Sequence, residues 1–428
     1  MWKRSHNAKN SKRGGKKPSA AILMAEQEGL AENDLKLVAE LREHVKDVLP
    51  SHFDTDFNLF RWITAWNYDM NISKTRLRRH LKFRNVIDLD GEENAYLCDG
   101  ELYTNYIPVG VVGPVGKSNR ILAFELAGGG DPDGIVKSVQ TSAFMLHRFK
   151  FLAKIQRMVL EQEKLTNKQS GLIYVYDLEG LSLDTSLLAI VTGPLRIMWA
   201  QIYDNFPELM SRIIIVNVPT FMNIIWKAFS AFVPEHTKQK IIFTGSNWKE
   251  ELLEFVSPEC LPVHWGGTMT DSKGDEMCRE LIVVPPGKIP TQLYWKPKPG
   301  EPSIDDLISV NVTAGAKAFV SFHVREPDTV MEWFLYSDQE YTFGIFFNKD
   351  PQCRKMSEME EIFNENTMPA MNTVDQFRYR CRRAGAYHFK FGNEGAWFMS
   401  VCPKYLTRLW DKQGNTVEPD LLERFEPF

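Results

Sequence analysis

The sequence predicts a multidomain protein with a small helical unit, an α/β domain built on a mostly parallel sheet, and an all-β antiparallel sandwich. Helical periodicity over residues 34–90, alternation of strands and helices over about residues 105–275, and a period of two after residue 303 lead to this prediction. The 428 residues would fill two or three domains of roughly 150 residues each. Hydrophobic residues make up 43% of the chain, which excludes a mainly disordered protein.

Charge and cysteine usage narrow the class of protein. The formal net charge of −4 argues against a general nucleic-acid binder. The 6 cysteines form no CxxC pair, so they indicate neither a disulfide scaffold nor a zinc site, and a reducing compartment suits them. No apolar run approaches the ~18 residues of a membrane span, and the apolar stretch at 20–25 is too short for a secretory signal. We therefore expect a cytoplasmic protein.

Residues 1–33 are predicted to form a basic disordered tail, since residues 1–20 contain several Lys and Arg and no Asp or Glu. A solubilising arm is the favoured interpretation. Attachment to an anionic membrane surface, or a role in nucleic-acid contact or nuclear import, stays open.

Residues 34–90 are predicted to be helical. Apolar residues recur at spacings of three and four before Pro50, which ends the first helix. Thr55 and its acidic neighbours offer N-caps for a second helix, and Ser73 for a third. The third helix is strongly basic, with Lys74, Arg76, Arg78, Arg79, Lys82 and Arg84. A solvated face is favoured for these charges over contact with phosphate or membrane.

Residues 91–280 are predicted to form the α/β domain. The expected strands are 121–126, 173–177, 212–217 and 240–244, and the expected helices are 135–165, 187–206 and 222–232. A proline-rich linker over 281–302 then separates the domains. Residues 303–405 alternate with a period of two, as in Phe377-Arg378-Tyr379-Arg380 and Tyr387-His388-Phe389-Lys390, which indicates a half-buried antiparallel sandwich. Residues 406–428 are expected to be a C-terminal tail.

The sequence contains no complete catalytic motif, and one segment comes close to a phosphate-binding loop. Residues 111–118 (VVGPVGKS) approach a phosphate-binding loop, but Val111 stands where that loop needs glycine and a strand-like segment follows. We expect a hairpin turn at Lys117 and Ser118 and no nucleotide binding. Nothing in the sequence groups a nucleophile with a base, and there is no HExxH motif. The sequence therefore predicts no enzyme, no metal site and no cofactor.

The segment 219–234 is almost wholly apolar, with Lys227 as its single charge. A helix that is apolar nearly all round is either buried or covers something apolar. A plain core helix and a lid over a lipid cavity both fit these residues.

Several segments together resemble a known family. Residues 56–69 (DFNLFRWITAWNYD) and the basic helix resemble the CRAL-TRIO N-terminal helical region. Within the α/β domain the matching segments are 172–180 (LIYVYDLEG), 205–210 (NFPELM), 213–219 (IIIVNVP), 241–247 (IIFTGSN) and 261–267 (LPVHWGG). The C-terminal unit is similar to a GOLD domain. The whole resembles the cytosolic phosphatidylinositol-transfer-like proteins that combine CRAL-TRIO and GOLD domains, a group that includes tocopherol-associated relatives.

This resemblance implies that 219–234 is a lid, or gate, over a lipid cavity, and it implies specific ligand contacts. The acidic residue and the lysine of the family's phosphatidylinositol signature fall on Glu208 and Lys240; a surface ion pair is the alternative for these two. The chain departs from the family at two places. Trp66 replaces an arginine that assists the headgroup, leaving Arg61 of that run, and Leu172 and Tyr174 replace the hydroxyls of phosphatidylcholine-binding members. The expected gate and cavity residues are Phe221, Met222, Ile225, Trp226, Phe229 and Phe232.

The function expected from the resemblance is that of a lipid-binding and lipid-transfer protein. It would carry a single phosphoinositide or other hydrophobic lipid in a gated cavity and dock transiently on membrane surfaces. The alternative is a lipid-sensing adaptor that recruits a protein partner through the GOLD-like unit. Neither function involves nucleic acid or a cofactor other than the bound lipid.

Overall fold

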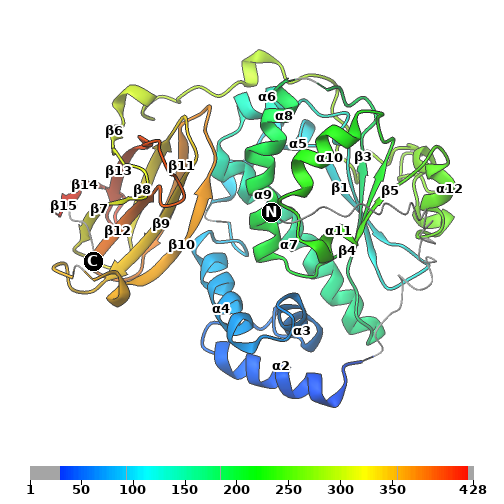
Figure 1. Cartoon of the computed structure of the whole chain (residues 1–428), viewed down its shortest axis with the longest axis horizontal. Coiled ribbons are helices and arrows are strands. Elements are labelled where there is room, and N and C mark those ends of the chain that lie inside the picture. Colours follow the sequence, from blue (N-terminus) through cyan, green and yellow to red (C-terminus); the bar gives the residue numbers. More distant parts are fainter. Residues whose placement is uncertain (1–28, 93, 184, 354, 423–428) are drawn as a thin grey trace, which may run out of the picture.

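The computed structural model describes residues 29–92, 94–183, 185–353 and 355–422. Three bodies lie side by side (Figure 1): a helical unit, an α/β domain and a β-sandwich. This confirms the predicted fold class. Most of the predicted basic tail, residues 1–28, lies outside the described residues.

The helical unit contains α2 (Glu32–Val45), α3 (Asp56–Ala65) and α4 (Met70–Val86). Their apolar faces meet in a core that includes Leu41, Trp62 and Leu77. Thr55 caps α3 as predicted, since its hydroxyl accepts from an amide of the first turn. The cap predicted for α4 is wrong. The Asp69 carboxylate caps that helix, whereas Ser73 is buried inside it and donates its hydroxyl to the Asp69 carbonyl at 2.8 Å.

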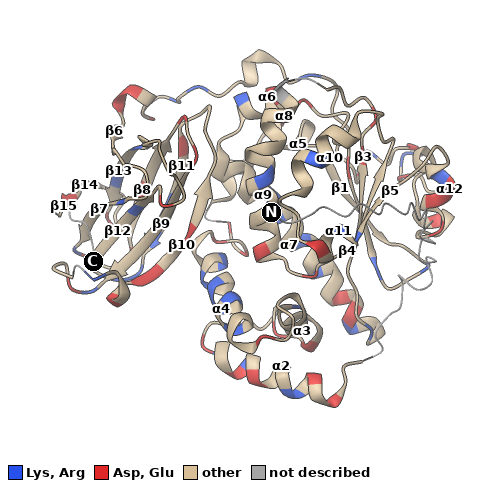
Figure 2. Cartoon of the chain, in the orientation of Figure 1, with Lys and Arg blue, Asp and Glu red and all other residues tan. Residues whose placement is uncertain are grey.

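The predicted solvated face of the basic helix is also wrong. Figure 2 shows Lys and Arg along α4, and these cations form ion pairs within the protein. The pairs to the rest of the helical unit are Lys74–Glu40, Arg78–Asp47 and Arg84–Asp90. Arg76 reaches Asp204 of the α/β domain at 3.2 Å. Arg79 and Lys82 reach Glu361 and Glu360 of the sandwich at 2.8 and 2.9 Å. The helix therefore connects all three bodies.

The α/β sheet has the order β1-β2-β3-β4-β5. Its strands are β1 (Val109–Pro114), β2 (Ile121–Glu125), β3 (Leu172–Asp177), β4 (Met210–Val216) and β5 (Ile241–Phe243). The pair β1–β2 is antiparallel, so the turn that contains Lys117 and Ser118 is a hairpin, as predicted. The pairs β2–β3, β3–β4 and β4–β5 are parallel.

The helices of this domain are shorter than the sequence pattern suggested. They are α5 (Glu101–Asn105), α6 (Pro132–Ser138), α7 (Thr141–Thr166), α8 (Thr185–Thr192), α9 (Pro194–Asn205), α10 (Met222–Ser230), α11 (Glu235–Lys238) and α12 (Trp248–Leu252). The expected helix 135–165 breaks at Val139, whose backbone is extended. The expected helix 187–206 breaks at Gly193, where Pro194 starts α9.

Both faces of the sheet are apolar, as parallel strands require. Alternate residues such as Phe124, Val175 and Ile214 pack against α12 and the segment that follows it. Their neighbours, including Tyr174, Ile213 and Ile215, face the side of α7, α9 and α10. The second face positions the site described below.

The sandwich consists of two antiparallel sheets, β10-β9-β12-β7-β15 and β11-β8-β13-β14, with β6 paired to β13. The strands are β6 (Ile308–Ser309), β7 (Lys317–Val324), β8 (Thr329–Tyr336), β9 (Tyr341–Asn348), β10 (Glu360–Met368), β11 (Asp375–Cys381), β12 (Gly385–Gly392), β13 (Lys404–Trp410), β14 (Thr416–Val417) and β15 (Asp420–Leu421).

Two predictions about the sandwich are wrong. Residues 406–428 are not simply a tail, because β13 continues to Trp410 and β15 pairs with β7 at the edge of the first sheet. The polar positions of β12 are not solvent-facing either. His388 bonds Ser321 at 2.8 Å, and Lys390 is 4% exposed and pairs with Glu365 at 2.6 Å. Nearby Phe319, Phe346 and Met359 form a small cluster on the outer side of the same sheet.

Candidate functional site

A cavity of about 610 Å³ lies where the α/β domain meets the sandwich. Its wall comes from α6 to α10, from the ends of β2, β3 and β4, and from the sandwich. Most of the lining is apolar, for example Met145, Leu195, Ile197, Trp199 and Ile215. The volume falls within the ~300–1,000 Å³ that is usual for small-molecule sites, so the cavity can enclose a hydrophobic ligand.

Helix α10 forms one side of this cavity. Met222, Ile225, Trp226 and Phe229 line it, as does Phe232 just beyond the helix. Phe221, the remaining expected gate residue, is not in the lining and instead packs against a cluster that includes Leu187 and Val191 of α8.

Only Ile225 of α10 is buried, while Ile224 and Phe232 are 52% and 54% exposed. One face of the helix therefore lines the cavity and the other is exposed to solvent, whereas a plain core helix would be buried on all sides.

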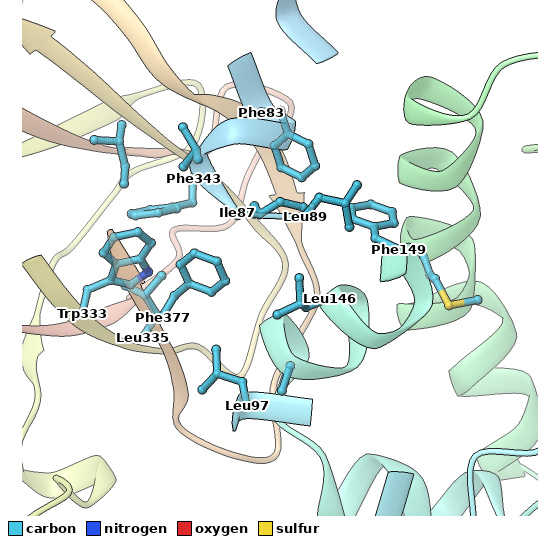
Figure 3. Packing of buried hydrophobic residues seen from close by; sticks show 14 of the residues in the cluster. Phe83, Ile87, Leu89, Leu97, Leu146, Phe149, Trp333, Leu335, Phe343 and Phe377 are labelled. Carbon is cyan, nitrogen blue, oxygen red and sulfur yellow. The ribbon is translucent and has the colours of Figure 1, made fainter. Parts of the chain in front are cut away.

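The sandwich supplies the opposite part of the wall. Trp333, Phe343 and Phe377 line the cavity together with the segment 366–373. Figure 3 shows these rings pointing toward Phe83, Leu146 and Phe149 from the helical and α/β parts. The core is thus continuous across the junction, and the shape of the cavity depends on how the two domains dock.

Hydrogen bonds fix this docking beside the cavity. Gln140 donates to the Val374 carbonyl at 2.8 Å, and Thr373 donates to the Val139 carbonyl at 3.1 Å. The Asp375 carboxylate accepts from the Ser142 amide at 2.8 Å and from its hydroxyl at 2.6 Å. Asp375 therefore caps the first turn of α7 from another domain, since no side chain caps that helix locally. Burial raises the pKa of Asp375 to about 6.

The two predicted headgroup residues lie together in a separate polar pocket of about 360 Å³. The Lys240 ammonium donates to the Glu208 carboxylate at 2.7 Å, with side chains 20% and 25% exposed. Arg212, His236 and Gln239 also line the pocket. Glu208 has a positive φ of 54°, an uncommon conformation for a residue with a side chain and one that recurs at functional positions.

Trp66, which departs from the family motif, and Arg61, which is retained from it, both have structural roles here. Arg61 is 2% exposed and forms an ion pair with Glu163, and it also donates to the Ser170 carbonyl at 2.9 Å. It therefore ties α3 to the end of α7 and does not line the polar pocket. The Arg76 guanidinium lies over the Trp66 ring, with its central carbon 4.7 Å from the ring centroid.

A charged cluster in the cavity wall escaped the sequence analysis. The Arg148 guanidinium donates through Nη2 to Glu125 Oε2 at 2.6 Å and to the Tyr174 hydroxyl at 3.0 Å. The Tyr174 hydroxyl donates to the same Glu125 oxygen at 2.7 Å. Burial alone would lower the pKa of Arg148, but the Glu125 carboxylate and the Tyr174 and Tyr176 oxygens together outweigh burial and raise it, so this side chain stays charged. Glu125 and Arg148 both line the cavity.

Asp177, at the end of β3, joins segment 172–180 to segments 213–219 and 261–267. Its carboxylate accepts from the Trp265 indole at 2.8 Å and from Asn217 at 2.8 Å. Asp177, Glu179 and His264 also lie close enough to share a metal ion. Because donors of the protein already occupy both Asp177 oxygens, a structural role accounts for this carboxylate.

Comparisons with family models divide the chain in the same way as the structure. Residues 131–267 match the model described as CRAL/TRIO domain. Residues 30–92 match a domain of unknown function (DUF8435), and residues 293–418 match a model described as "F28H7_8_C:-like, C-terminal domain". The likeness of the C-terminal unit to a GOLD domain stays a prediction. In the part of the chain that the structure describes, no helix combines the length and apolarity of a membrane span.

Curated relatives extend over nearly the whole chain. "Protein ctg-1" of Caenorhabditis elegans is 23% identical over 92% of this chain and 99% of its own length. A solved structure, "Crystal structure of Sfh5", overlaps 60% of this chain and 94% of its own with 15% identity and a TM-score of 0.43. "CRAL-TRIO domain-containing protein F28H7.8" of Caenorhabditis elegans is 32% identical over 89% of this chain and 92% of its own. The chain therefore belongs to the CRAL-TRIO domain-containing proteins.

Proposed function

We propose that this protein binds and transfers lipids, carrying one phosphatidylinositol or other hydrophobic lipid in the cavity behind α10. The apolar cavity is the observation that carries the proposal. Each methylene of an acyl chain that enters it gains ~0.8 kcal/mol, so a cavity of this kind favours long-chain ligands. Membership in the CRAL-TRIO proteins supports a lipid-binding or lipid-transfer protein.

The polar pocket would hold the headgroup. Lys240 is a point charge suited to a phosphate, and Glu208 can orient that lysine or accept hydrogen bonds from inositol hydroxyls. The pocket adjoins the cavity, since Thr237 of α11 lines the cavity and His236 lines the pocket. A lipid could then place its chains in the cavity and its phosphate beside Lys240.

Helix α10 would act as the gate. Its inner face touches the cavity and its outer face exposes Ile224, while Phe232, just beyond the helix, lines the cavity and is still 54% exposed. Exposed apolar side chains next to a lipid cavity suit transient contact with a bilayer. Opening of the gate on that surface would release or accept the lipid.

The test of the headgroup site is transfer of radiolabelled phosphatidylinositol between vesicles. Lys240→Ala should lower transfer about tenfold or more, since a hydrogen bond to a charged group contributes roughly 1.5–3 kcal/mol. Lys238→Ala is the matched control because Lys238 pairs with Glu235 and does not line the pocket. Equal transfer by both folded variants would remove the headgroup assignment.

One observation favours the alternative of an adaptor. Trp397, Phe398 and Met399, between β12 and β13, are 87%, 93% and 66% exposed, which is unusual for large apolar residues. They suit either a protein partner or the bilayer. Replacing all three with serine should leave transfer between protein-free vesicles unchanged if the loop serves a protein partner, and should slow it if the loop contacts lipid.

A further inference from the structure

The cluster of Glu125, Arg148 and Tyr174 is out of place in an apolar cavity, and it offers unused donors. The Arg148 side chain is 2% exposed and that of Glu125 is 14% exposed. All of the cluster's hydrogen bonds converge on one guanidinium nitrogen, Nη2, and one carboxylate oxygen, Oε2. The Nε–H of Arg148 is buried without a hydrogen-bond partner among the described residues.

A buried donor of a charged group without a partner is costly, and a buried ion pair often gives no net stability over apolar residues. Stability of the fold therefore does not account for this cluster. In apolar ligand sites a small number of polar groups usually fix the orientation of the ligand. Arg148 and Glu125 line the cavity, and so does Tyr176, whose buried hydroxyl lies near the Glu125 carboxylate but makes no regular hydrogen bond among the described residues.

The charges of the cluster restrict the ligand. The positive charge of Arg148 is balanced by Glu125, so an anionic group placed there would be an extra buried charge without compensation. An uncharged oxygen can instead accept from Arg148 and from the Tyr176 hydroxyl at no electrostatic cost. The phosphate site, by contrast, lies in the separate pocket at Lys240.

We propose that the Arg148–Glu125–Tyr174 cluster is a second recognition point, which binds an uncharged oxygen of the lipid, such as an ester carbonyl or a hydroxyl. This inference rests on the proposed lipid-binding function. It makes the cavity selective for neutral oxygenated lipids over plain hydrocarbons and over fatty-acid anions of equal chain length.

The test loads the full chain from vesicles that contain equal amounts of hexadecane, hexadecan-1-ol, methyl hexadecanoate and hexadecanoate, and then quantifies the bound probes. The wild-type chain should enrich the alcohol and the ester about tenfold over the alkane, the effect of one hydrogen bond from a charged donor. Glu125→Gln/Arg148→Met removes both charges together. It should abolish this enrichment while hexadecane still binds.

Binding of hexadecane serves as the control for an intact cavity, because an alkane makes no hydrogen bond with the cluster. If the double variant loses its fold, Tyr176→Phe replaces it and should lower the enrichment several-fold. Equal binding of hexadecane and hexadecan-1-ol by the wild-type chain would overturn this inference and leave the proposed function standing. Unchanged enrichment in the variant would do the same. A chain that binds none of the probes and transfers no phosphatidylinositol contradicts the proposed function instead.

Discussion

We expect Asp375 to make the docking of the two domains dependent on pH. Its carboxyl group is 2% exposed and accepts two hydrogen bonds from Ser142, a residue 233 positions away. Burial raises the folded-state pKa to about 6, above the unfolded value of 3.8. The stabilising contribution of this group is therefore complete below about pH 4 and is lost as the pH rises through about 6.

The size of the effect follows from the two pKa values. One pKa unit corresponds to about 1.4 kcal/mol, so the contribution lost between about pH 4 and pH 8 approaches about 3 kcal/mol. Asp375→Asn cannot ionise, and its amide can still accept from the Ser142 amide and donate to the Ser142 hydroxyl. The free energy of unfolding of the wild type, relative to this variant, should therefore fall across that pH range and then level off.

Urea unfolding followed by tryptophan fluorescence from about pH 4 to 8 measures this difference. Comparison with the variant cancels other titrations, such as those of His80 and His147. Burial lowers their pKa values to about 3 and about 4, so their contributions are lost as the pH falls below 6.5. Asp338→Asn, at an exposed position of the same sandwich, should show no such trend. A wild-type-minus-Asp375→Asn difference that is constant with pH would refute the reasoning.

Three further predictions concern the gate, the hairpin and the buried Asp177. Phe229→Asp should strongly slow transfer between vesicles while the melting temperature stays close to that of the wild type, since a charge in hydrocarbon costs at least ~2.5–3.5 kcal/mol. Ile224→Asp, outside the cavity lining, controls for the added charge. A Phe229→Asp chain with normal transfer would exclude the gate. Lys117→Ala should leave lipid binding unchanged, and saturable ATP binding lost in that variant would contradict the hairpin assignment. Trp265→Phe removes the buried 2.8 Å bond to Asp177 and should destabilise the α/β domain by roughly 1.5–3 kcal/mol in thermal unfolding, whereas an unchanged melting temperature would show that the bond is not needed.

The order of elements was accessible from the sequence because it depends on local pattern. Short apolar runs rich in β-branched residues, such as residues 213–216, favour buried strands, and the alternation after residue 303 correctly gave antiparallel sheets. The pairing of Glu208 with Lys240 could also be anticipated, although only through the resemblance. Nothing in the 31 intervening residues indicates that the two side chains meet.

Contacts between distant segments were not accessible. The basic run on α4 has the sequence of a solvated helix, yet its partners Glu360 and Glu361 lie 278 and 282 residues further along the chain. Lys390 alternates with aromatic residues like an exposed lysine, but a nearby apolar cluster and Glu365 cover it. Local periodicity cannot report such coverage, because it is decided by tertiary packing.

The charged cluster in the cavity was missed for a similar reason. Glu125 ends an apolar strand and Arg148 lies within a long helix, and each is an ordinary residue in its own element. A weak signal did exist, because Arg148 lies between Leu146 and Phe149 on the buried side of α7. A charge at such a position implies a buried partner.

The central claim is that the cavity behind α10 holds a lipid, and the most direct measurement is the amount of lipid bound per chain. The chain would be incubated with vesicles that contain radiolabelled phosphatidylinositol, separated from them by gel filtration and counted. We expect a stoichiometry that approaches one lipid per wild-type chain and is much lower for Lys240→Ala. A well-folded wild-type chain that elutes without lipid would contradict it.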